Sequence, residues 1–425
     1  MTREWDVVVV GGGLAGRMAT LAANAVGASV HLVTETADAL RHSSGLLEVL
    51  GYAPGPDEPI TRPFDRVSEL PTDHPYSLLG ESTVREALRL LGSAVGEDVV
   101  GLASARNGLF VGPLGIPTVA FGYPSAVEPG LLSRPGDFLL VDIDPLRDFD
   151  ASIAAANLER SLPATDVDAA AIDISAVTTP ETDSLELARR LDRECSRTPE
   201  QGAVLGELGT ALAAVASGYE RVGVPAVLGV RAAAAVRQRV ADQVDASLFE
   251  IPTGPPSVLG IRLDEALDEA IPETDTLVTR GPRVVEYRGA NDRITAVQID
   301  RDGATEWVRG RQFVLATGGL IGGGLQATRS DIAEPLFDCP VSAPADPREW
   351  TAERPFDSQP FASVGVSVDE TLRPVESAQT THFSNLRAAG DVLGGFDPVA
   401  EGSSAGVATA TGYAAGRWAA QEARS

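Results

Sequence analysis

The chain has 425 residues, 44% of them hydrophobic, which is enough for two or three domains with cores of their own. Its 60 acidic residues outnumber its 34 basic residues, all of which are arginine, and the net charge is −26. Such a surface repels nucleic acid and anionic lipid, and no apolar run approaches the roughly 20 residues that span a membrane.

The acidic residues are spread along the chain, which favours a general surface adaptation, such as solvation at high salt, over one specific acidic patch. The two cysteines, Cys195 and Cys339, are far apart and outside any metal-ligand spacing. We therefore expect no disulfide framework and no zinc or iron–sulfur site in this chain, but reduced, buried thiols in a cytoplasmic protein. The first apolar run starts so close to Met1 that we expect no secretory signal.

The first predicted elements are a strand, a glycine loop, a helix and a second strand. Residues 6–10 form a β-branched apolar run, residues 14–26 are rich in alanine, and residues 29–33 form another apolar run. Three glycines in the loop satisfy the spacing G-x-G-x-x-G, namely Gly11, Gly13 and Gly16. They permit a tight turn, a close approach of backbone to a phosphate and close packing of helix on strand, and the helix N-terminus attracts the anion. This context predicts a nucleotide site.

A second alternation of strands and helices occupies the middle of the chain. After a helix at 82–96 and Gly/Pro-broken strand-like runs at 108–127, we expect strands at 137–143, 168–174, 223–230 and 246–252. Helices are predicted at 149–162, over much of 184–217 and at 231–244. Strands that alternate with helices indicate a parallel sheet, and the block has no glycine loop like the first one.

The last third of the chain is β-rich from about residue 275 and then returns to glycine loops. "FVLATGG" (313–319) and "LRAAGDVLGG" (386–395) are strands that end in glycine, and a helix of small residues follows "EGSSAG". We therefore predict two domains, one made of residues 1–100 and 262–425 and an inserted α/β, cap-like domain of residues 101–261. No internal repeat is evident.

Together the three glycine loops resemble, in matching order, the motifs of flavoproteins with the two-dinucleotide-binding fold. The resemblance implies an α/β, Rossmann-like flavoprotein fold with an inserted α/β domain, in which Asp391 bonds the ribityl or phosphate region and the last helix faces the flavin ring. "RHSSG" (41–45) matches a Ser/Thr-rich loop that contacts the ring. The implied cofactor-binding residues, besides the first three glycines, are Ser43, Ser44, Gly45, Thr317, Gly318, Gly390, Asp391, Ser403, Ser404 and Ala405.

The arrangement is most similar to the fumarate reductase and succinate dehydrogenase type of flavoprotein, with one informative departure. Fumarate reductases of that family follow Gly-Gly with a substrate histidine and then an Asn-Arg pair. This chain has Asp397-Pro398 and Ala400-Glu401 at those positions. We therefore do not expect it to reduce fumarate, although a stand-alone flavin oxidoreductase acting on a small acid is kept as the alternative function.

Several strings resemble the B subunit of the anaerobic glycerol-3-phosphate dehydrogenase: "HSSGLLEVL", "HPYSLL", "GPLG", "PPSVLGIRL", "VDETLRP" and "LGGFDP". The resemblance covers essentially the whole chain. It implies a complex that oxidises sn-glycerol 3-phosphate to dihydroxyacetone phosphate and passes electrons towards quinone. Its other members are an FAD-containing A subunit and an iron–sulfur C subunit, which attaches the complex to the inner face of the cell membrane. The lysine-free, acidic composition suggests a halophilic version.

The end of the second strand bears on the choice of flavin. An acid at that position holds the adenosine ribose of FAD or NAD, but here the position falls on Thr34, with Glu35 one residue later. The resemblance implies FMN in this subunit, and Thr34 is consistent with FMN, because FMN has no adenosine and needs no such acid. The other interpretation, that Glu35 turns inward and binds FAD, stays open.

Four residues are candidates for catalysis: His74, Arg262, Arg373 and Asp397. His74 is a possible acid or base near the flavin, or else it fixes the turn before Pro75. Arg262, after an apolar strand-like run, and Arg373 are possible phosphate ligands, or else partners in structural ion pairs. Asp397 is by default a turn residue. His42 is a candidate for covalent flavin attachment, or an ordinary hydrogen-bond donor in a loop.

Overall fold

The computed structural model describes residues 3–36, 40–53, 58–162, 166–175, 178–179, 181–196, 203–354, 358–377 and 380–425. The chain forms two compact units. The first consists of Met1–Ala39, Glu48–Val95 and Leu267–Ser425, and the second of Leu40–Leu47 and Gly96–Ala266. The main boundaries thus fall at 95/96 and 266/267, where the sequence suggested 100/101 and 261/262, and the short segment Leu40–Leu47 belongs to the second unit.

The first unit contains a seven-stranded sheet with the order β11-β2-β1-β14-β13-β12, and β21 pairs with the end of β14. Its strands are β1 (Glu4–Val10), β2 (Val30–Thr34), β11 (Thr276–Arg280), β12 (Arg283–Ala290), β13 (Arg293–Arg301), β14 (Ala304–Leu315) and β21 (Leu386–Ala388). β11, β2, β1, β14 and β21 pair in parallel, whereas β12 and β13 form an antiparallel hairpin against the first half of β14. The valines of β1 are buried because both faces of a parallel sheet are covered.

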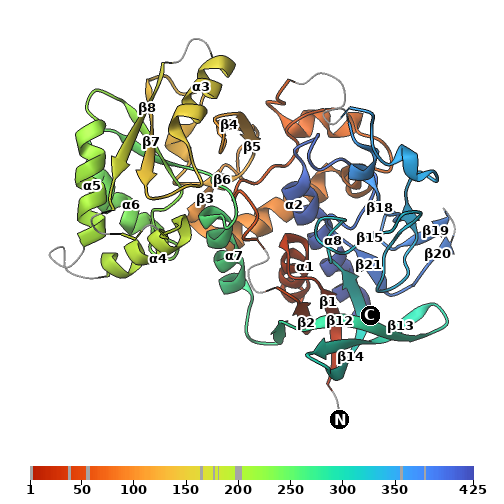
Figure 1. Cartoon of the computed structure of the whole chain (residues 1–425). Coiled ribbons are helices and arrows are strands. Elements are labelled where there is room, and N and C mark those ends of the chain that lie inside the picture. The colour runs from red at the N-terminus through yellow and green to blue at the C-terminus, as the bar shows by residue number, and fades with distance from the viewer. Residues whose placement is uncertain are drawn as a thin grey trace. The chain divides into compact units, whose positions relative to one another are not determined.

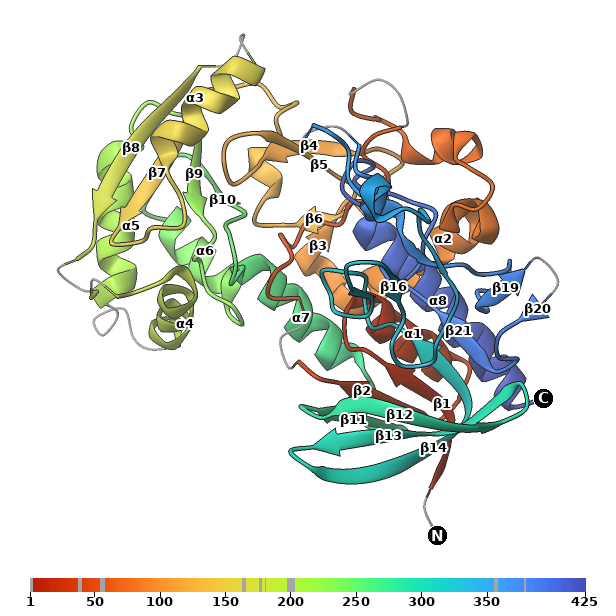
Figure 2. The same cartoon turned by 45° about the vertical axis from the view of Figure 1, so that its right-hand side comes forward.

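Three long helices belong to this unit: α1 (Leu14–Ala25), α2 (Pro75–Val95) and α8 (Ser404–Ala423). α1 and α8 lie side by side in both views (Figures 1 and 2). Gly412 and Gly416 of α8 make this possible, because a Cβ added to them would lie 2.2 Å from the carbonyl oxygen of Ala15 and 2.0 Å from that of Ala19. α2 begins earlier than the helix expected at 82–96 and is broken at Gly80, whose φ is 75°.

The remaining described elements of the first unit are short. They are the two-residue to three-residue strands β15 (Gln326–Ala327), β16 (Ile332–Ala333), β17 (Val341–Ser342), β18 (Gly365–Val366), β19 (Val375–Ser377) and β20 (Thr380–Thr381), and the 3-10 helices η1 (Pro63–Glu69), η5 (Pro347–Glu349) and η6 (Pro360–Ser363). The sequence pattern had predicted none of these elements, because they are too short to show a periodicity.

The second unit is built on a four-stranded parallel sheet with the order β10-β9-β7-β8. Its strands are β7 (Phe138–Asp144), β8 (Val167–Asp173), β9 (Arg221–Pro225) and β10 (Ser247–Ile251), and its helices are α3 (Ala151–Ser161), α4 (Ser184–Cys195), α5 (Ala203–Val215), α6 (Ala233–Ala241) and α7 (Val258–Ala270). Alternate residues of β7 enter two different cores: Leu139 and Val141 pack with α4, α5 and α6, whereas Phe138 and Leu140 pack with α3.

Smaller elements complete the second unit, and one of its helices corrects the sequence analysis. The elements are β3 (Val99–Val100), β4 (Gly108–Val111), β5 (Pro117–Ala120), β6 (Tyr123–Pro124), η2 (Gly96–Asp98) and η3 (Glu128–Gly130). The apolar run before Arg262, which read as strand-like, is the start of α7, and the chain returns to the first unit within this helix. Ser257 begins the helix, because its Oγ accepts a hydrogen bond of 3.1 Å from the backbone N–H of Gly260.

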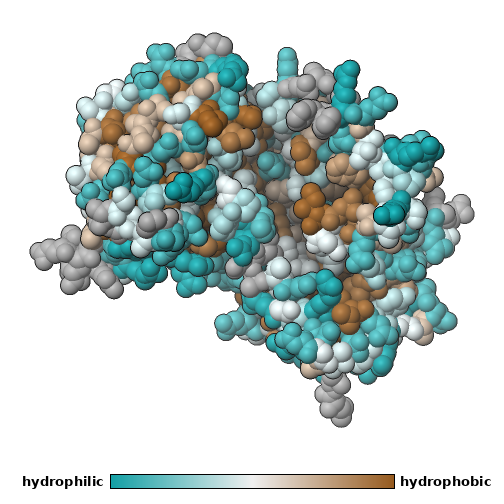
Figure 3. Space-filling model, viewed as in Figure 1, coloured by the Kyte–Doolittle hydropathy of each residue, from teal (hydrophilic) through white to brown (hydrophobic). Residues whose placement is uncertain are grey.

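The predicted fold class is confirmed, since a Rossmann-like parallel sheet is interrupted by a second α/β sheet. Hydrophilic residues cover much of the face drawn in Figure 3, and hydrophobic residues gather there in separate patches. Cys195 and Cys339 are both buried. Over the described residues, no helix is long and apolar enough to cross a membrane.

Candidate functional site

Three loops meet at the carboxyl edge of the parallel sheet in the first unit. Val10 of β1 lies beside Leu315 of β14, and Leu315 lies beside Ala388 of β21, so the three strands end at the same level. The loops that follow touch one another. A Cβ on Gly11 would lie 2.0 Å from the carbonyl oxygen of Ala316, and one on Gly319 would lie 2.6 Å from that of Asp391. The three motifs of the sequence thus form one site at the edge where nucleotides bind in open α/β sheets.

The glycines of the first loop have two different explanations. Gly11 has a φ of 112°, and side chains on Gly12 and Gly16 would collide with Thr34 and with the carbonyl oxygen of Gly11, so the fold itself requires all three glycines. Gly13 is different. Its φ is −69°, and a Cβ there would meet nothing within 4 Å. The packing of the loop therefore does not require a glycine at position 13, and the space beside it is open.

The helix that follows the loop begins without a side-chain acceptor. Gly13 is the N-cap of α1, and the first turn holds no acidic residue. Within the described part of the chain, the backbone N–H groups of Gly13, Leu14 and Ala15 have no hydrogen-bond partner. Free N–H groups and the helix dipole attract an anion such as a phosphate.

A buried arginine forms a hydrogen bond with the backbone of this loop. The side chain of Arg17, 2% exposed, donates from Nη1 to the carbonyl oxygen of Gly12, and its Nε lies 3.1 Å from Oδ1 of Asp268. Asp268 also forms an ion pair of 2.9 Å with Arg280. Arg17 therefore fixes the conformation of the glycine loop and brings a positive charge close to its backbone.

The last helix also begins with free donors. Ser403, the N-cap of α8, makes no capping hydrogen bond, and the N–H of Gly406 donates to the carbonyl oxygen of Glu48 at 2.8 Å. The N–H groups of Ser404 and Ala405 have no partner among the described residues. The positive end of α8 is thus available to a negatively charged or electron-rich ligand.

Three helices of the second unit, α3, α4 and α5, begin in the opposite way, because carboxylates of the chain itself accept from their first N–H groups. At α3, Asp150 accepts from the N–H of Ile153 and Asp142 accepts from that of Ala151. At α4, Asp183 accepts from the N–H of Glu186, and at α5, Glu194 accepts from those of Val204 and Leu205. In the turn before α6, Asp192 accepts from the N–H groups of Val230, Arg231 and Ala232. A carboxylate in this position occupies the place that an anionic ligand would take. Among helices α1–α8 as described, α1, α6 and α8 begin without a side-chain cap, and of these α1 and α8 start at the edge where the glycine loops meet.

Two further groups of the three-loop site fit a bound polar ligand. Thr317 has a buried Oγ1 that no described group contacts by a hydrogen bond. Asp391 is accessible to solvent and accepts from Ser404 Oγ at 3.3 Å, while the surrounding protein desolvates its carboxyl and raises its pKa. Both groups are suited to form hydrogen bonds with the hydroxyls of a ligand.

The end of β2, where an acid would bind an adenosine ribose, has no carboxylate free to do so. Thr34 is buried against Gly12, and its Oγ1 donates to the carbonyl oxygen of Thr36 at 2.9 Å. Glu35 points outward, with 57% of its side chain exposed, and forms an ion pair of 3.3 Å with Arg283. The geometry therefore gives no support to an inward-facing Glu35.

The Ser/Thr-rich loop of the sequence analysis lies in the second unit. Ser43 Oγ accepts from the N–H of Gly45, and Ser44 Oγ accepts from the N–H of Leu46, both at 3.2 Å. Gly45 has a φ of 76°, and a Cβ on it would lie 2.5 Å from that of Leu259. The exposed His42 belongs to the same segment. These contacts give the serines a turn-forming role, and their contact with a flavin stays a prediction.

His74 lies in a hydrogen-bonded network that leads to the start of α8. The ring is fully buried, Nδ1 accepts from the N–H of Tyr76 at 3.0 Å, and Nε2 lies 3.0 Å from Oε2 of Glu401. Because Nδ1 is an acceptor, Nε2 carries the proton and donates to Glu401. Glu401 also accepts from Ser403 Oγ at 3.0 Å and from the N–H of Asp397 at 3.1 Å. His74 thus positions the loop before α8.

Asp397 has the turn-forming role that is the default for this residue. Its Oδ1 accepts from the N–H groups of Val399 at 3.1 Å and of Ala400 at 2.9 Å. This arrangement directs the chain into the turn that carries Glu401. Asp397 therefore shapes the same loop as His74, and a catalytic role for either residue stays a prediction.

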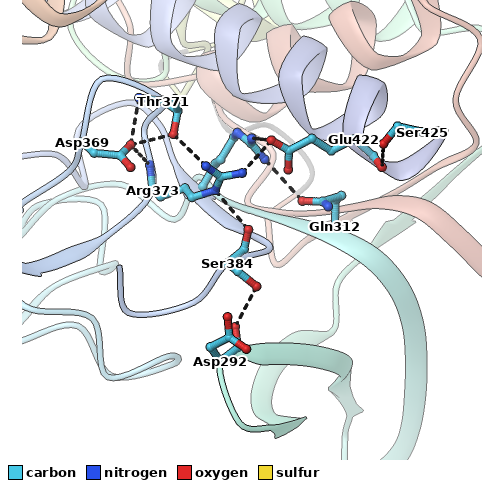
Figure 4. Close-up of polar contacts among 9 residues, drawn as sticks. Asp292, Gln312, Asp369, Thr371, Arg373, Ser384, Glu422 and Ser425 are labelled. Carbon is cyan, nitrogen blue, oxygen red and sulfur yellow. Dashed lines mark hydrogen bonds and ion pairs between the residues drawn. The ribbon is translucent and has the colours of Figure 1, made fainter. Parts of the chain in front are cut away.

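Arg262 and Arg373 are both held in ion pairs. Arg262 forms an ion pair of 2.5 Å with Glu250, which is fully buried, and also donates to the carbonyl oxygen of Gly229. Arg373 points at Glu422 (Figure 4), with 2.6 Å between Nη2 and Oε1. Glu422 lies 18 residues from Ser404, or about 27 Å along α8, so Arg373 is remote from the ligand-facing end of that helix. Structural ion pairs, the alternative to phosphate binding, therefore account for the positions of both arginine side chains.

Three residues of the site were not predicted as such: Arg17, Glu48 and Glu401. Arg17 stands in the helical run after the glycine loop, and a lone arginine in an otherwise apolar helix segment is a usable signal. The other two were quoted in the sequence motifs but given no role, because only the tertiary structure brings them to the N-terminus of α8.

Comparisons with known proteins extend this description. The sequence profile of the FAD binding domain family matches residues 6–407. The chain is 37% identical, over 99% of both chains, to a protein of Halobacterium salinarum that is named as the probable B subunit of anaerobic glycerol-3-phosphate dehydrogenase. It is 30% identical to the B subunit of anaerobic glycerol-3-phosphate dehydrogenase of Vibrio vulnificus, over 97% of this chain and 95% of the other.

Solved structures give more distant similarities. The chain is 12% identical to Sdh1 of Mycobacterium smegmatis in complex with UQ1, with a TM-score of 0.43, and the similarity covers 100% of this chain and 69% of the other. It is 10% identical to 3-ketosteroid delta1-dehydrogenase from Sterolibacterium denitrificans, with a TM-score of 0.42, over 99% and 100% of the two chains.

Proposed function

The chain belongs to the FAD binding domain family and, within it, to the family of anaerobic glycerol-3-phosphate dehydrogenase B subunits, and from this premise we propose its part in the reaction. It is the flavin-containing electron carrier of a complex that oxidises sn-glycerol 3-phosphate to dihydroxyacetone phosphate. The two electrons of the substrate pass through the flavin of this chain towards quinone.

One observation supports this proposal above the others: α1 and α8 begin with free N–H groups at the edge where three glycine loops meet. The cofactor phosphate lies beside Gly13 at the start of α1. The ribityl hydroxyls bond Asp391, and the start of α8 faces the electron-rich edge of the ring, where it stabilises negative charge on the reduced cofactor. The flavin is bound noncovalently.

We propose FMN as the flavin, with FAD as the alternative that the name of the matching family suggests. The support comes from the end of β2, where Thr34 is engaged with Thr36 and Glu35 with Arg283. An adenosine ribose would find no free carboxylate there, whereas the single phosphate of FMN needs only the glycine loop and the helix N-terminus.

When bound, a flavin accepts two electrons at once and returns them one at a time. The residues of the chain bind and orient it: Gly13, Leu14 and Ala15 present N–H groups to the phosphate, and Ser404 and Ala405 present theirs to the ring. His74 and Glu401 hold the loop that sets the position of this second group of donors. Over the described residues no cluster of metal ligands occurs, and we assign the one-electron carrier to a partner.

The partners proposed are an FAD-containing A subunit and an iron–sulfur C subunit. The B designation of the relatives supports a complex of several subunits. Attachment to the inner face of the cell membrane is proposed through a partner. A stand-alone reductase of a small acid is not proposed, because Asp397, Ala400 and Glu401 form a turn where fumarate reductases carry substrate-binding groups.

The test is to purify the full chain, denature it by heat and identify the released cofactor by mass spectrometry. We expect FMN in the supernatant at about one per chain. Recovery of FAD alone would overturn the choice of flavin and leave the site intact, and recovery of no flavin would overturn the site. Colour retained on the denatured protein would instead support covalent attachment at His42.

A second experiment tests the complex. The chain purified under mild conditions, at the salt concentration of the cell, should bring with it one chain that contains FAD and one that contains iron–sulfur clusters. Steady reduction of fumarate by the isolated chain, at the rates of about 1–1000 s⁻¹ that working enzymes reach, would contradict the assignment as an electron carrier.

A further inference from the structure

A segment that directly follows the Ser/Thr-rich loop runs along the start of α8. The carbonyl oxygen of Glu48 accepts from the N–H of Gly406 at 2.8 Å. The N–H groups of Gly51 and Tyr52 donate to the carbonyl oxygen of Glu401 at 2.8 Å and 2.9 Å. These hydrogen bonds fix Glu48 and Tyr52 beside the first turn of α8, next to the free N–H groups of the proposed flavin site.

The carboxyl of Glu48 has no structural role that explains it. It is partly buried, and no described residue donates a hydrogen bond to it or forms an ion pair with it. The neighbouring Glu401 differs, since His74, Ser403 and the N–H of Asp397 all bond its carboxylate. A desolvated carboxyl without a partner costs stability, so its presence beside a ligand site points to a function towards the ligand.

The ionisable groups around Glu48 are few. Tyr52 belongs to the same segment, and its pKa is raised by burial and then by the charge of Glu48, which shows that the two side chains are near each other. From the elements packed against this segment come Tyr76, whose hydroxyl donates to the carbonyl oxygen of Val49, and the pair of His74 and Glu401. Asp391, in the loop after β21, accepts from Ser404 at the start of α8. No arginine forms an ion pair with Glu48 among the described residues.

Burial, without help from a neighbouring charge, raises the pKa of Glu48 to about 7. A carboxyl with such a pKa is partly ionised near neutral pH and exchanges its proton readily. Its ordinary range would leave it fully ionised there.

We propose that Glu48 is the group that takes up a proton when the flavin bound to this chain is reduced and releases it when the flavin is reoxidised. Two electrons from the donor enter the flavin, whose ring takes its own proton. One further proton passes from solvent to the Glu48 carboxylate, whose charge changes from −1 to 0. On reoxidation both electrons leave for the acceptor, and the ring proton and the Glu48 proton both return to solvent.

The electrostatic reason is that reduction adds negative charge beside a carboxylate that protein has desolvated. A like charge raises the pKa of a carboxyl further, so reduction converts a partly ionised Glu48 into a protonated one. Coupling of this kind relieves the repulsion between Glu48 and the reduced ring, while the N-terminus of α8 stabilises the ring itself. Tyr52 lies near enough to Glu48 to share the proton path.

The inference rests on the proposed flavin site, and its test separates the two. The full chain, loaded with flavin, is titrated with dithionite against redox dyes from pH 5.5 to pH 9, and the midpoint potential is compared between the native chain and Glu48→Gln. Above pH 7 the midpoint potential of the native chain should fall more steeply with pH than that of Glu48→Gln. The difference in slope should correspond to the uptake of one additional proton per two electrons. Below the pKa of Glu48 the two slopes should be equal, because the carboxyl is then protonated in both redox states.

The proposal also predicts the direction in which the midpoint potential of Glu48→Gln differs from that of the native chain. At alkaline pH the native chain should have the lower potential, because Glu48→Gln removes the negative charge that opposes reduction. Glu81→Gln, which alters an exposed carboxylate on α2, is the control and should follow the native curve. Parallel curves for the native chain and Glu48→Gln over the whole range would overturn the role of Glu48, whereas failure of the native chain to bind flavin would overturn the proposed function instead.

A second measurement covers the case in which Glu48→Gln does not retain flavin. The infrared difference spectrum of the native chain, reduced minus oxidised at pH 8, should contain a positive band of a protonated carboxyl group, which shifts in D₂O. Absence of that band in a fully reduced sample would contradict the proposal without the need for a variant.

Discussion

The two parallel sheets of this chain carry helices that begin in opposite ways. In the second unit the first N–H groups of α3, α4 and α5 are bonded by carboxylates of the chain, namely Asp150, Asp183 and Glu194. In the first unit α1 and α8 begin at Gly13 and Ser403 without a side-chain cap. Both units have the topology that binds nucleotides in other proteins, so topology alone does not assign the site.

The difference shows how one fold is used for two purposes. A carboxylate at a helix start satisfies the N–H groups and complements the dipole, which stabilises the helix and closes the position to an anion. A helix start left bare by its own chain costs stability until a ligand supplies the acceptor. The bare helix starts of the first unit are the observation on which the proposed cofactor site rests, whereas several helices of the second unit are stabilised by carboxylates of the chain. Three variants test this contrast, beginning with the largest expected effect.

The largest effect is expected in the second unit, from Glu250→Ala. The substitution removes the partner of Arg262, whose side chain is only 13% exposed, and leaves its charge uncompensated. Loss of one partner of such a buried pair lowers the free energy of unfolding by about 3–5 kcal/mol. Urea unfolding followed by circular dichroism, at constant high salt, measures it. Flavin content should be unchanged in the protein that remains folded.

Glu265→Ala is the matched control for this variant. Glu265 pairs with Arg231 at the surface, where 78% of the arginine side chain is exposed, and the change in unfolding free energy should stay below about 1 kcal/mol. If Glu250→Ala left stability unchanged and instead abolished substrate oxidation in the complex, the catalytic interpretation of Arg262 would return.

The second effect is expected in the first unit, from Gly13→Glu. A carboxylate would occupy the open space beside Gly13 and compete with the phosphate for the N–H groups of α1, as carboxylates do in the second unit. Hydrogen bonds to a charged group contribute about 1.5–3 kcal/mol each, so the dissociation constant of the flavin should rise at least about a hundredfold. Fluorescence titration of the apoprotein measures it, and thermal unfolding of the apoprotein should change little.

Gly206→Glu is the control for added bulk and charge. A Cβ on Gly206, in α5 of the second unit, also meets nothing within 4 Å, and flavin affinity should be unaltered. Normal flavin binding by Gly13→Glu would mean that the phosphate lies elsewhere and that the bare start of α1 has another explanation.

The smallest effect is expected from Glu35→Gln. Because Glu35 is exposed and paired with Arg283, its neutralisation should change the flavin dissociation constant by less than about twofold. Asp391→Ala, which removes an acceptor inside the three-loop site, should weaken binding about tenfold in the same assay. A large loss of affinity in Glu35→Gln would indicate an adenosine ribose on Glu35 and therefore FAD.

Much of the fold followed from local patterns. The βαβ start, the alternation from residue 137 to 252 and the terminal helix each show the periodicity or glycine punctuation of the element that forms. α7 was not recognised, because an apolar run such as the one before Arg262 is compatible with either a strand or a buried helix segment. Its capping residue, Ser257, was the signal that distinguishes them.

The sequence by itself determined the three glycine loops and their order, because a turn that needs a positive φ or a close approach of backbone leaves a glycine at a fixed position. Only the tertiary structure decided that the space beside Gly13 is open, that Glu35 is paired with Arg283, and that Arg373 is paired with Glu422. These decisions depend on contacts between segments far apart along the chain. The register of the strands that creates such contacts comes from the packing of the whole sheet, which no local pattern records.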